Sequence, residues 1–380
     1  MPLLLWKTDL NQGRVLVAAS RVIGDNKSFA AAFDNQILLF IPEDGEYLPS
    51  ARIQLDSSIT AIQGWKPGLA QEGVDQLVAS TAETIFWLSG GPGRLSITAR
   101  TDPETSADFV DIATGDLDRD GIEEVVAAAS GMDSIFVYRP VAEPETALEL
   151  VGIRLVPGTP RFVEVLTRPE MNPAIAVVYE REGQSGLALF SLTDDGFEAG
   201  PVLEGLPLGI TGLATGNFLP QIGDELAIGG PGGMVWLLQD GGRIDVLMVT
   251  ESLGASISAL ASTNNEMDNL IAGTPGGYVF VFRYPVKRSP DLAFNVGEGI
   301  SSLQYLGRER LVVGTTLGGV QVWSLANGEQ ENTYIVGSGD SLWSIAERFG
   351  VSVEQILALN PSITNRNIIM PGQIIKIPVP

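Results

Sequence analysis

The sequence predicts a mainly β protein, a seven-bladed β-propeller followed by a small domain of βααβ order. Two observations lead to this prediction. A pair of short β-rich phrases recurs seven times before residue 326, and two amphipathic helical segments flanked by short strands follow residue 332. The patterns place a propeller over residues 1–326, a linker over 327–332 and the small domain over 333–380.

The repeating unit contains two adjacent strands. The first is a run of small apolar residues, such as EEVVAAAS from Glu123 and DELAIGG from Asp224. The second has an apolar residue followed three positions later by an aromatic residue or Leu. Its copies begin at Ile37, Ile85, Ile135, Leu187, Val235, Val279 and Val320. Looser apolar strands lie before and after the pair, and units of four short strands at intervals of about 40–50 residues are typical of propeller blades. Two β-sandwiches are the alternative, but sandwiches need not repeat in sequence.

The two ends of the repeat region complement each other. The last unit ends at VQVWSL, near Leu325, without a fourth strand of its own. The apolar segment from Pro2 to Trp6 precedes the first unit and has no partner there. We therefore expect the N-terminal strand to complete the last blade, because this pairing would cover both exposed edges.

The composition excludes several kinds of chemistry. The chain of 380 residues has 23 Lys and Arg against 46 Asp and Glu, a formal charge of -23. Such a charge repels phosphate backbones, so we expect no nucleic-acid partner. Cys and His are both absent, which excludes disulfides, thiolate nucleophiles, imidazole bases and zinc sites built from these residues. A metal would need oxygen ligands, as calcium and magnesium do.

The N-terminal sequence MPLLLWK shows no targeting pattern. It lacks the basic region and the apolar run of about 7–15 residues that mark a secretory signal. No apolar run approaches the roughly 18 residues that span a bilayer. We therefore expect no membrane span. No export signal is visible, so a location on the cytoplasmic side, where the chain is synthesised, stays open as well.

One loop carries the strongest metal signal in the chain. Asp116, Asp118 and Asp120 alternate along it, and a glycine follows that permits a sharp turn. Carboxylates at the first, third and fifth positions converge on one centre in an EF-hand loop. Here the seventh position would offer the carbonyl of Ile122 and the ninth the side chain of Glu124.

The loop leads into a strand and not into a helix. The stretch ATGDLDRDGIEEVVAAAS, from Ala113 to Ser130, resembles the FG-GAP (integrin-alpha-type) repeat, while the other units match that repeat only in degenerate form. The resemblance implies a calcium ion with a structural role, bound between the first two strands of the third blade. A solvated acidic turn without an ion is the alternative. No catalytic residue is predicted, because no pair of carboxylates stands out among the many acidic residues.

The C-terminal domain has strong helix signals. Leu342, Ile345, Ala346 and Phe349 fall on one helical face, and either Asp340 or Ser341 would cap that helix. A Ser–Gln capping box at residues 352 and 355 begins a second helix. Short strands near 334–336 and 374–377 complete the βααβ order.

The words YIVGSGDSLWSIA, FGVS, NPSI and IIMPGQIIKIP, spread over residues 334–378, resemble a LysM domain along its full length. LysM domains bind chains that contain N-acetylglucosamine (GlcNAc), in peptidoglycan or chitin, in a shallow groove between the loop after the first strand and the loop after the second helix. The resemblance therefore implies a glycan site at Gly339, Asp340, Ser341, Leu342, Asn360, Pro361, Ile363 and Ile369. Each of these residues also has a structural interpretation: Asp340 and Asn360 as helix caps, and Leu342, like the nearby Trp343, as a core residue.

These features predict a non-catalytic bacterial protein of the cell wall that binds peptidoglycan or another GlcNAc polymer. The propeller would be an interaction scaffold, with a protein partner on one face. One alternative is a polysaccharide- or peptidoglycan-cleaving enzyme, with catalysis on the propeller and targeting by the LysM domain. Another is a structural component of the spore envelope, which the missing export signal would fit. The ligand of the propeller and the oligomeric state do not follow from the sequence.

Overall fold

The computed structural model describes most of the chain. The described residues are 2–10, 13–19, 28–43, 45–68, 75–142, 145–169, 171–193, 195–263, 267–326, 332–336, 340–349, 351–360, 363, 365–366, 368–370 and 373–377. They divide into a larger unit, Leu4–Trp323, and a smaller one that contains Ser324–Pro380. The expected linker falls on residues 327–332, of which 327–331 lie outside the described residues.

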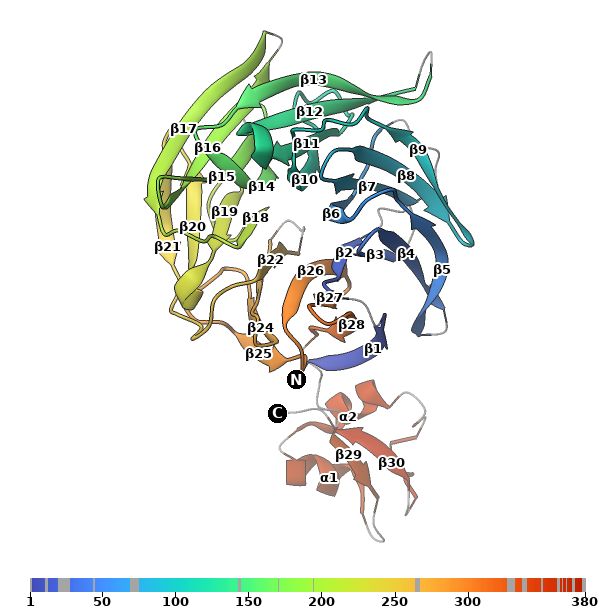
Figure 1. The fold of residues 1–380 in the computed structure, drawn as a ribbon. Coiled ribbons are helices and arrows are strands. Elements are labelled where there is room, and N and C mark those ends of the chain that lie inside the picture. Colours follow the sequence, from blue (N-terminus) through green and yellow to red (C-terminus); the bar gives the residue numbers. More distant parts are fainter. Residues whose placement is uncertain are drawn as a thin grey trace. The chain divides into compact units, whose positions relative to one another are not determined.

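The larger unit is a β-propeller (Figure 1), and its described residues form seven four-stranded sheets. Blade 1 contains β2 (Leu16–Ala19), β3 (Phe29–Phe33), β4 (Gln36–Glu43) and β5 (Glu46–Gln54). Blade 2 contains β6 (Ile59–Gly64), β7 (Asp75–Thr81), β8 (Ile85–Gly91) and β9 (Arg94–Arg100). Blade 3 contains β10 (Phe109–Gly115), β11 (Glu124–Ala129), β12 (Ser134–Val141) and β13 (Ala147–Leu155), with a short 3₁₀ turn, η1 (Ser130–Met132), after β11.

The remaining blades follow in chain order. Blade 4 contains β14 (Thr159–Leu166), β15 (Ala174–Arg181), β16 (Gln184–Thr193) and β17 (Gly196–Leu206). Blade 5 contains β18 (Gly212–Gly216), β19 (Glu225–Gly229), β20 (Val235–Asp240) and β21 (Ile244–Val249), with η2 (Pro231–Gly233) after β19. Blade 6 contains β22 (Ala259–Ser262), β23 (Leu270–Gly273), β24 (Tyr278–Phe282) and β25 (Leu292–Asn295). Blade 7 contains β26 (Ile300–Gly307), β27 (Arg310–Thr315), β28 (Gly319–Ser324) and the N-terminal β1 (Leu3–Asp9).

The blades form a closed ring. The first strand of each blade packs against the first strands of both neighbouring blades, and β26 of blade 7 packs against β2 of blade 1. The fourth strand of blade 7 is β1, which pairs with β28. The predicted ring closure is therefore confirmed: one sheet joins the two ends of the propeller sequence (Figure 1).

The core lies between the blades. On β11, Val125 and Ala127 belong to the cluster shared with blade 2, whereas Val126 and Ala128 belong to the cluster shared with blade 4. Alternate residues of a strand point to opposite faces, so a strand buried on both faces is apolar throughout. This explains the continuous runs of small residues in the sequence repeat, because small side chains let neighbouring sheets approach closely.

The smaller unit has the predicted βααβ order: β29 (Asn332–Ile335), α1 (Leu342–Phe349), α2 (Val353–Leu359) and β30 (Ile374–Ile377). β29 and β30 pair antiparallel. Asn332 was expected in the linker, but it is the first residue of β29 because its partner Ile377 extends the ladder to it. The described apolar core of this unit contains residues from both helices, from β30 and from the position that follows β29: Val336, Leu342, Ile345, Ala346, Val353, Ile356 and Ile375.

The second helix begins at the predicted capping box. The Ser352 side chain accepts a hydrogen bond from the Gln355 N–H, and the Gln355 side chain accepts one from the Ser352 N–H. Among the residues that the structure describes, no helix is long and apolar enough to cross a membrane.

Candidate functional site

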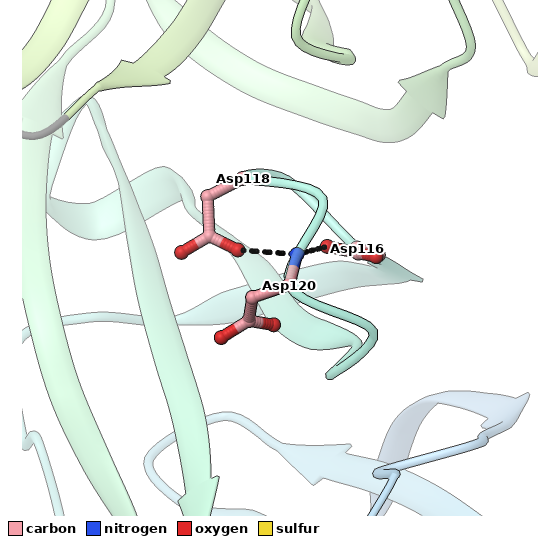
Figure 2. A group of neighbouring side chains, drawn as sticks. All are labelled: Asp116, Asp118 and Asp120. Carbon is pink, nitrogen blue, oxygen red and sulfur yellow. Dashed lines mark hydrogen bonds between the residues drawn. The ribbon is translucent and has the colours of Figure 1, made fainter.

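The predicted metal loop lies between β10 and β11, the first two strands of blade 3. Asp116, Asp118 and Asp120 gather there, each with a carboxylate oxygen within 4.8 Å of the others (Figure 2). Oxygens at such spacings suit the geometry of a calcium ion. The three aspartates that were predicted to converge therefore do so.

Backbone hydrogen bonds hold the loop in shape. Asp116 accepts from the N–H groups of Asp120 (3.1 Å) and Gly121 (2.9 Å), and Asp118 also accepts from the Asp120 N–H (3.3 Å). Asp120 Oδ1 accepts from the Ile122 N–H at 2.8 Å. Gly121 has a φ of 89°, which favours glycine, as the sequence predicted. These bonds leave one oxygen of Asp118 and one of Asp120 directed away from the loop backbone.

Glu124, the first residue of β11, accepts a hydrogen bond from the loop backbone. It is fully buried, and its Oε2 accepts a hydrogen bond from the Leu117 N–H at 2.9 Å. Burial raises the pKa of Glu124, while the hydrogen bonds from Leu117 and Arg139 act in the opposite direction. One oxygen of this predicted ligand is therefore already committed to the backbone.

Arg139 on β12 was missed by sequence reasoning. Its Nε donates to Glu124 Oε1 at 2.8 Å. Its Nη2 lies 2.7 Å from the same oxygen and 3.3 Å from Asp120 Oδ2, and it also contacts Asp118 Oδ2. The guanidinium thus contacts one oxygen of each of these three carboxylates, and the other oxygen of each accepts a hydrogen bond from the loop backbone. A positive group therefore lies among the proposed calcium ligands, and calcium binding at this loop stays a prediction.

A second acidic feature lies at the centre of the propeller. A cavity of about 550 Å³ is lined by the first strands of six blades and by the loops that follow them. Its charged lining residues come from four blades: Asp116, Arg119, Glu123, Glu164, Asp224 and Asp268. Burial raises the pKa of Asp224, and the nearby Asp268 adds to the effect, whereas a hydrogen bond from Thr167 opposes it. No local sequence motif could have revealed this cavity, because residues distant in sequence build it.

In the smaller unit, Ser341 caps the first helix. Its Oγ accepts a hydrogen bond from the Ser344 N–H at 3.2 Å, and the Ser341 N–H donates to Ser344 Oγ at 3.0 Å. Ser341 is exposed, while Asp340 before it is half-buried. The cap is therefore Ser341, one of the two residues that the sequence left open.

Two predicted glycan contacts have mainly structural roles. Leu342 is only 2% exposed and belongs to the domain core. Asn360 is 7% exposed; its side-chain amide donates to the Ile356 carbonyl at 2.7 Å and its N–H to the Leu357 carbonyl, which caps the second helix. Burial leaves these two side chains little surface to offer a sugar.

Predicted contacts from both groove loops take part in one apolar core. Ile363 and Ile369 are partly buried and pack against the cluster that contains Leu342. Gly339 and Pro361, also predicted contacts, lie outside the described residues. Trp343 is 68% exposed, so it is not a core residue. It directly follows Ser341 and Leu342 in sequence and presents a large aromatic surface to solvent.

The comparisons with known proteins divide along the same two units. Residues 334–378 match the family model described as LysM domain. Among relatives, "SpoIVD-associated factor A" of Bacillus subtilis is 53% identical over 45 residues, 12% of this chain and 12% of the relative. "N-acetylmuramoyl-L-alanine amidase sle1" of Staphylococcus saprophyticus is 41% identical over 66 residues, 17% of this chain and 19% of the relative. "Spore coat assembly protein ExsA" of Bacillus cereus is 42% identical over 45 residues, which are 12% of this chain and 7% of the relative.

The chain thus spans less than a fifth of the length of these relatives. The fold of the larger unit has its own likeness among solved structures. The chain titled BBS1N in complex with ARL6DN matches 86% of this chain and 98% of its own length, with a TM-score of 0.62 and 15% identity. At this identity the likeness shows the propeller fold alone.

Proposed function

We propose that the LysM domain at residues 334–378 attaches this protein to peptidoglycan or a related GlcNAc polymer. The observation that carries the proposal is the family match over the whole domain. The geometry supports it, because Leu342 at the start of α1 belongs to one apolar cluster, against which Ile363 and Ile369 pack after α2. A shallow apolar floor between polar loops suits an acetamide methyl group and its amide.

Two exposed side chains lie at the start of α1: that of Ser341, whose hydroxyl is engaged in the helix cap, and that of Trp343. An aromatic ring offers an apolar face on which a pyranose can stack. Leu342 and Asn360 would act indirectly, by holding the loop and the helix end in place. A single domain gives modest affinity, and tight retention would need a second contact.

We assign the propeller a non-catalytic role as an interaction scaffold. Its blades present loops around a central acidic cavity, a surface that suits a protein partner more than a nucleic acid or an anionic membrane. The matched relatives have different names, among them an amidase and a spore coat assembly protein. The LysM domain would therefore supply the location, and the propeller a function of its own.

The central cavity also supports the alternative of an LysM-targeted enzyme. Glycoside hydrolysis uses two carboxyl groups, one of them with a raised pKa, and Asp224 has a raised pKa at the cavity wall. Release of reducing ends from peptidoglycan would establish this alternative. Loss of that release in Asp224→Asn would place the chemistry in the cavity.

The proposed attachment to peptidoglycan is compatible with two locations in the cell. The names of the relatives support either the cell wall or the spore envelope. A fluorescently tagged full chain, observed in dividing and in sporulating cells, separates the two. Signal around dividing cells supports the wall, and signal confined to the developing spore supports the spore envelope.

Co-sedimentation with purified peptidoglycan tests the binding itself. The full chain should sediment with the polymer, and Trp343→Ala should reduce the bound fraction severalfold. Leu317→Ala is a matched control, because Leu317 is also a highly exposed apolar residue (70%) but lies in the propeller. Failure of the folded wild-type chain to sediment with peptidoglycan or chitin would contradict the proposal.

A further inference from the structure

The negative charges of the acidic loop in blade 3 face the positive charge of Arg139. The loop gathers the carboxylates of Asp116, Asp118 and Asp120 above the buried Glu124. Carboxylates at such short distances repel one another, and a positive partner relieves the repulsion. The FG-GAP resemblance assigns that task to a calcium ion.

The position that a cation would take is already filled. Arg139 Nη2 contacts Asp118 Oδ2 and lies 3.3 Å from Asp120 Oδ2 and 2.7 Å from Glu124 Oε1. A single nitrogen thus meets oxygens from three of the four carboxylates. Calcium binds oxygen ligands at about 2.3–2.6 Å, so an ion at this point and the Arg139 nitrogen exclude each other. The donor set with its arginine in place does not fit the ion.

Blade 5 gives an internal comparison. The pairing of β11 with β12 aligns Val125 with Tyr138, and the pairing of β19 with β20 aligns Leu226 with Leu238. Moving one step along each ladder sets Glu124 beside Arg139 in blade 3, and Glu225 beside the residue at position 239 in blade 5. Residue 239 is a glutamine. The corresponding positions can therefore be compared directly.

The buried glutamate has the same role in both blades. Glu225 Oε2 accepts from the Phe218 N–H at 2.7 Å, and Glu124 Oε2 from the Leu117 N–H at 2.9 Å; in each case the donor lies seven residues before the glutamate. Since loop 217–224 lacks alternating carboxylates, this bond is independent of a metal. Glu124 therefore closes its loop as Glu225 does.

The residue opposite the glutamate differs between these two blades. In blade 5 the neutral Gln239 donates to the Ile222 carbonyl at 3.2 Å. In blade 2 the corresponding pair is neutral on both sides, with the Ser89 hydroxyl donating to Gln76 Oε1 at 2.8 Å. In blade 3, where the loop carries three aspartates, the position holds Arg139. An arginine fork suits this task because it presents several donors at fixed angles to several carboxylates.

We propose that Arg139 is the resident cation of loop 116–124, so that the native propeller closes this loop without calcium. Removal of the guanidinium then leaves an open set of carboxylates that calcium can fill. The loop is a metal site of the repeat type in which a side chain has taken the place of the ion.

The test compares the wild type with Arg139→Gln, which introduces the residue of blade 5. After dialysis against EDTA, the full chain is titrated with CaCl₂ by calorimetry and melted with and without millimolar calcium. The wild type should bind no calcium, and its Tm should be the same with and without calcium. R139Q should melt several degrees lower in EDTA, take up one equivalent of calcium, and recover its Tm when calcium is added.

Two further variants complete the design. Arg161→Gln removes another arginine of the propeller, one in an exposed ion pair with Glu180, and should behave as the wild type. Asp118→Asn added to R139Q should abolish the calcium response. Uptake of one equivalent of calcium by the wild type, with a rise in Tm, overturns the proposal even if R139Q does not fold. A folded R139Q that gains no calcium response also overturns it.

Discussion

Trp6 of β1 and Phe40 of β4 lie edge to face, with ring centroids 5.4 Å apart. Trp6 also contacts Phe29 and Tyr47, at 6.2 and 5.8 Å between centroids. β1 belongs to blade 7, whereas these three aromatic residues belong to blade 1. The N-terminal strand therefore does two things: it supplies the fourth strand of the last blade and an aromatic side chain to the junction between the last blade and the first.

This junction predicts a large effect of Trp6→Ala. Loss of the ring removes three aromatic contacts, and we expect the free energy of unfolding to fall by about 2–4 kcal/mol. Leu3→Ala is the control on the same strand, since Leu3 is 62% exposed and should change stability by less than about 0.5 kcal/mol. Chemical denaturation of both variants measures the difference. Equal effects would mean that the Trp6 contacts do not stabilise the ring.

Deletion of residues 1–8 should have a still larger effect. It exposes the edge of β28 as well as the apolar junction, so the propeller should lose several kcal/mol or fail to fold. Calorimetric melting of the truncated chain tests this expectation. A truncated chain that melts at the wild-type temperature would contradict the closure by β1.

Asp111 predicts a pH-dependent stability. This residue of β10 lies in the inner ring and accepts a hydrogen bond from the Val163 N–H of β14 at 3.0 Å. Burial raises the pKa of Asp111 to about 7, although the backbone hydrogen bonds and the charge of Arg14 oppose the shift. The folded state therefore favours the protonated form, and the stabilisation from that form is lost as the pH rises from about 4 to 7.

Asp111→Asn keeps an acceptor for Val163 and removes the titration. Its gain in unfolding free energy over the wild type should grow between pH 4 and 7 and level off above, at about 1–3 kcal/mol. Asp56→Asn, a change at a side chain that is 83% exposed, should give no such slope. Urea unfolding of the three proteins at several pH values measures it. A gain of Asp111→Asn that does not vary with pH would refute the assignment.

The non-catalytic assignment predicts an absence of product. Incubation of the full chain with purified peptidoglycan should release no reducing ends above a blank, at neutral or at mildly acidic pH. Asp224→Asn should match the wild type in this assay. Product that disappears in Asp224→Asn would replace the scaffold function with an enzymatic one.

The repeat was predictable because propeller strands are buried on both faces. Such strands read as runs of small apolar residues, as in EVVAAA of β11, and they recur at the spacing of the blades. The closure by β1 followed from a strand that was missing at one end and spare at the other. The helix cap at Ser352 was also predictable, since a capping box depends on residues three positions apart, whereas the cap of the first helix was narrowed only to Asp340 or Ser341.

Interactions between distant segments were not predictable in the same way. Arg139 reaches the acidic loop from another strand, and its neighbours in sequence, Tyr138 and Pro140, carry no sign of it. The acidic residues of the central cavity come from four blades and share no local pattern. The roles of Leu342 and Asn360 stayed open, because a residue type does not distinguish a core position or a cap from a sugar contact.

The central claim concerns the glycan groove and is tested most directly at Ser341. Ser341→Ala and Ser341→Trp both remove the cap of α1, at a cost of about 1 kcal/mol in domain stability. Only the tryptophan also fills the groove. Titration of the full chain with chito-oligomers should give the same affinity for the wild type and Ser341→Ala, and an affinity at least about tenfold lower for Ser341→Trp, which is about 1.4 kcal/mol. Equal affinities for the two variants, or no binding by the folded wild type at millimolar sugar, would contradict the account.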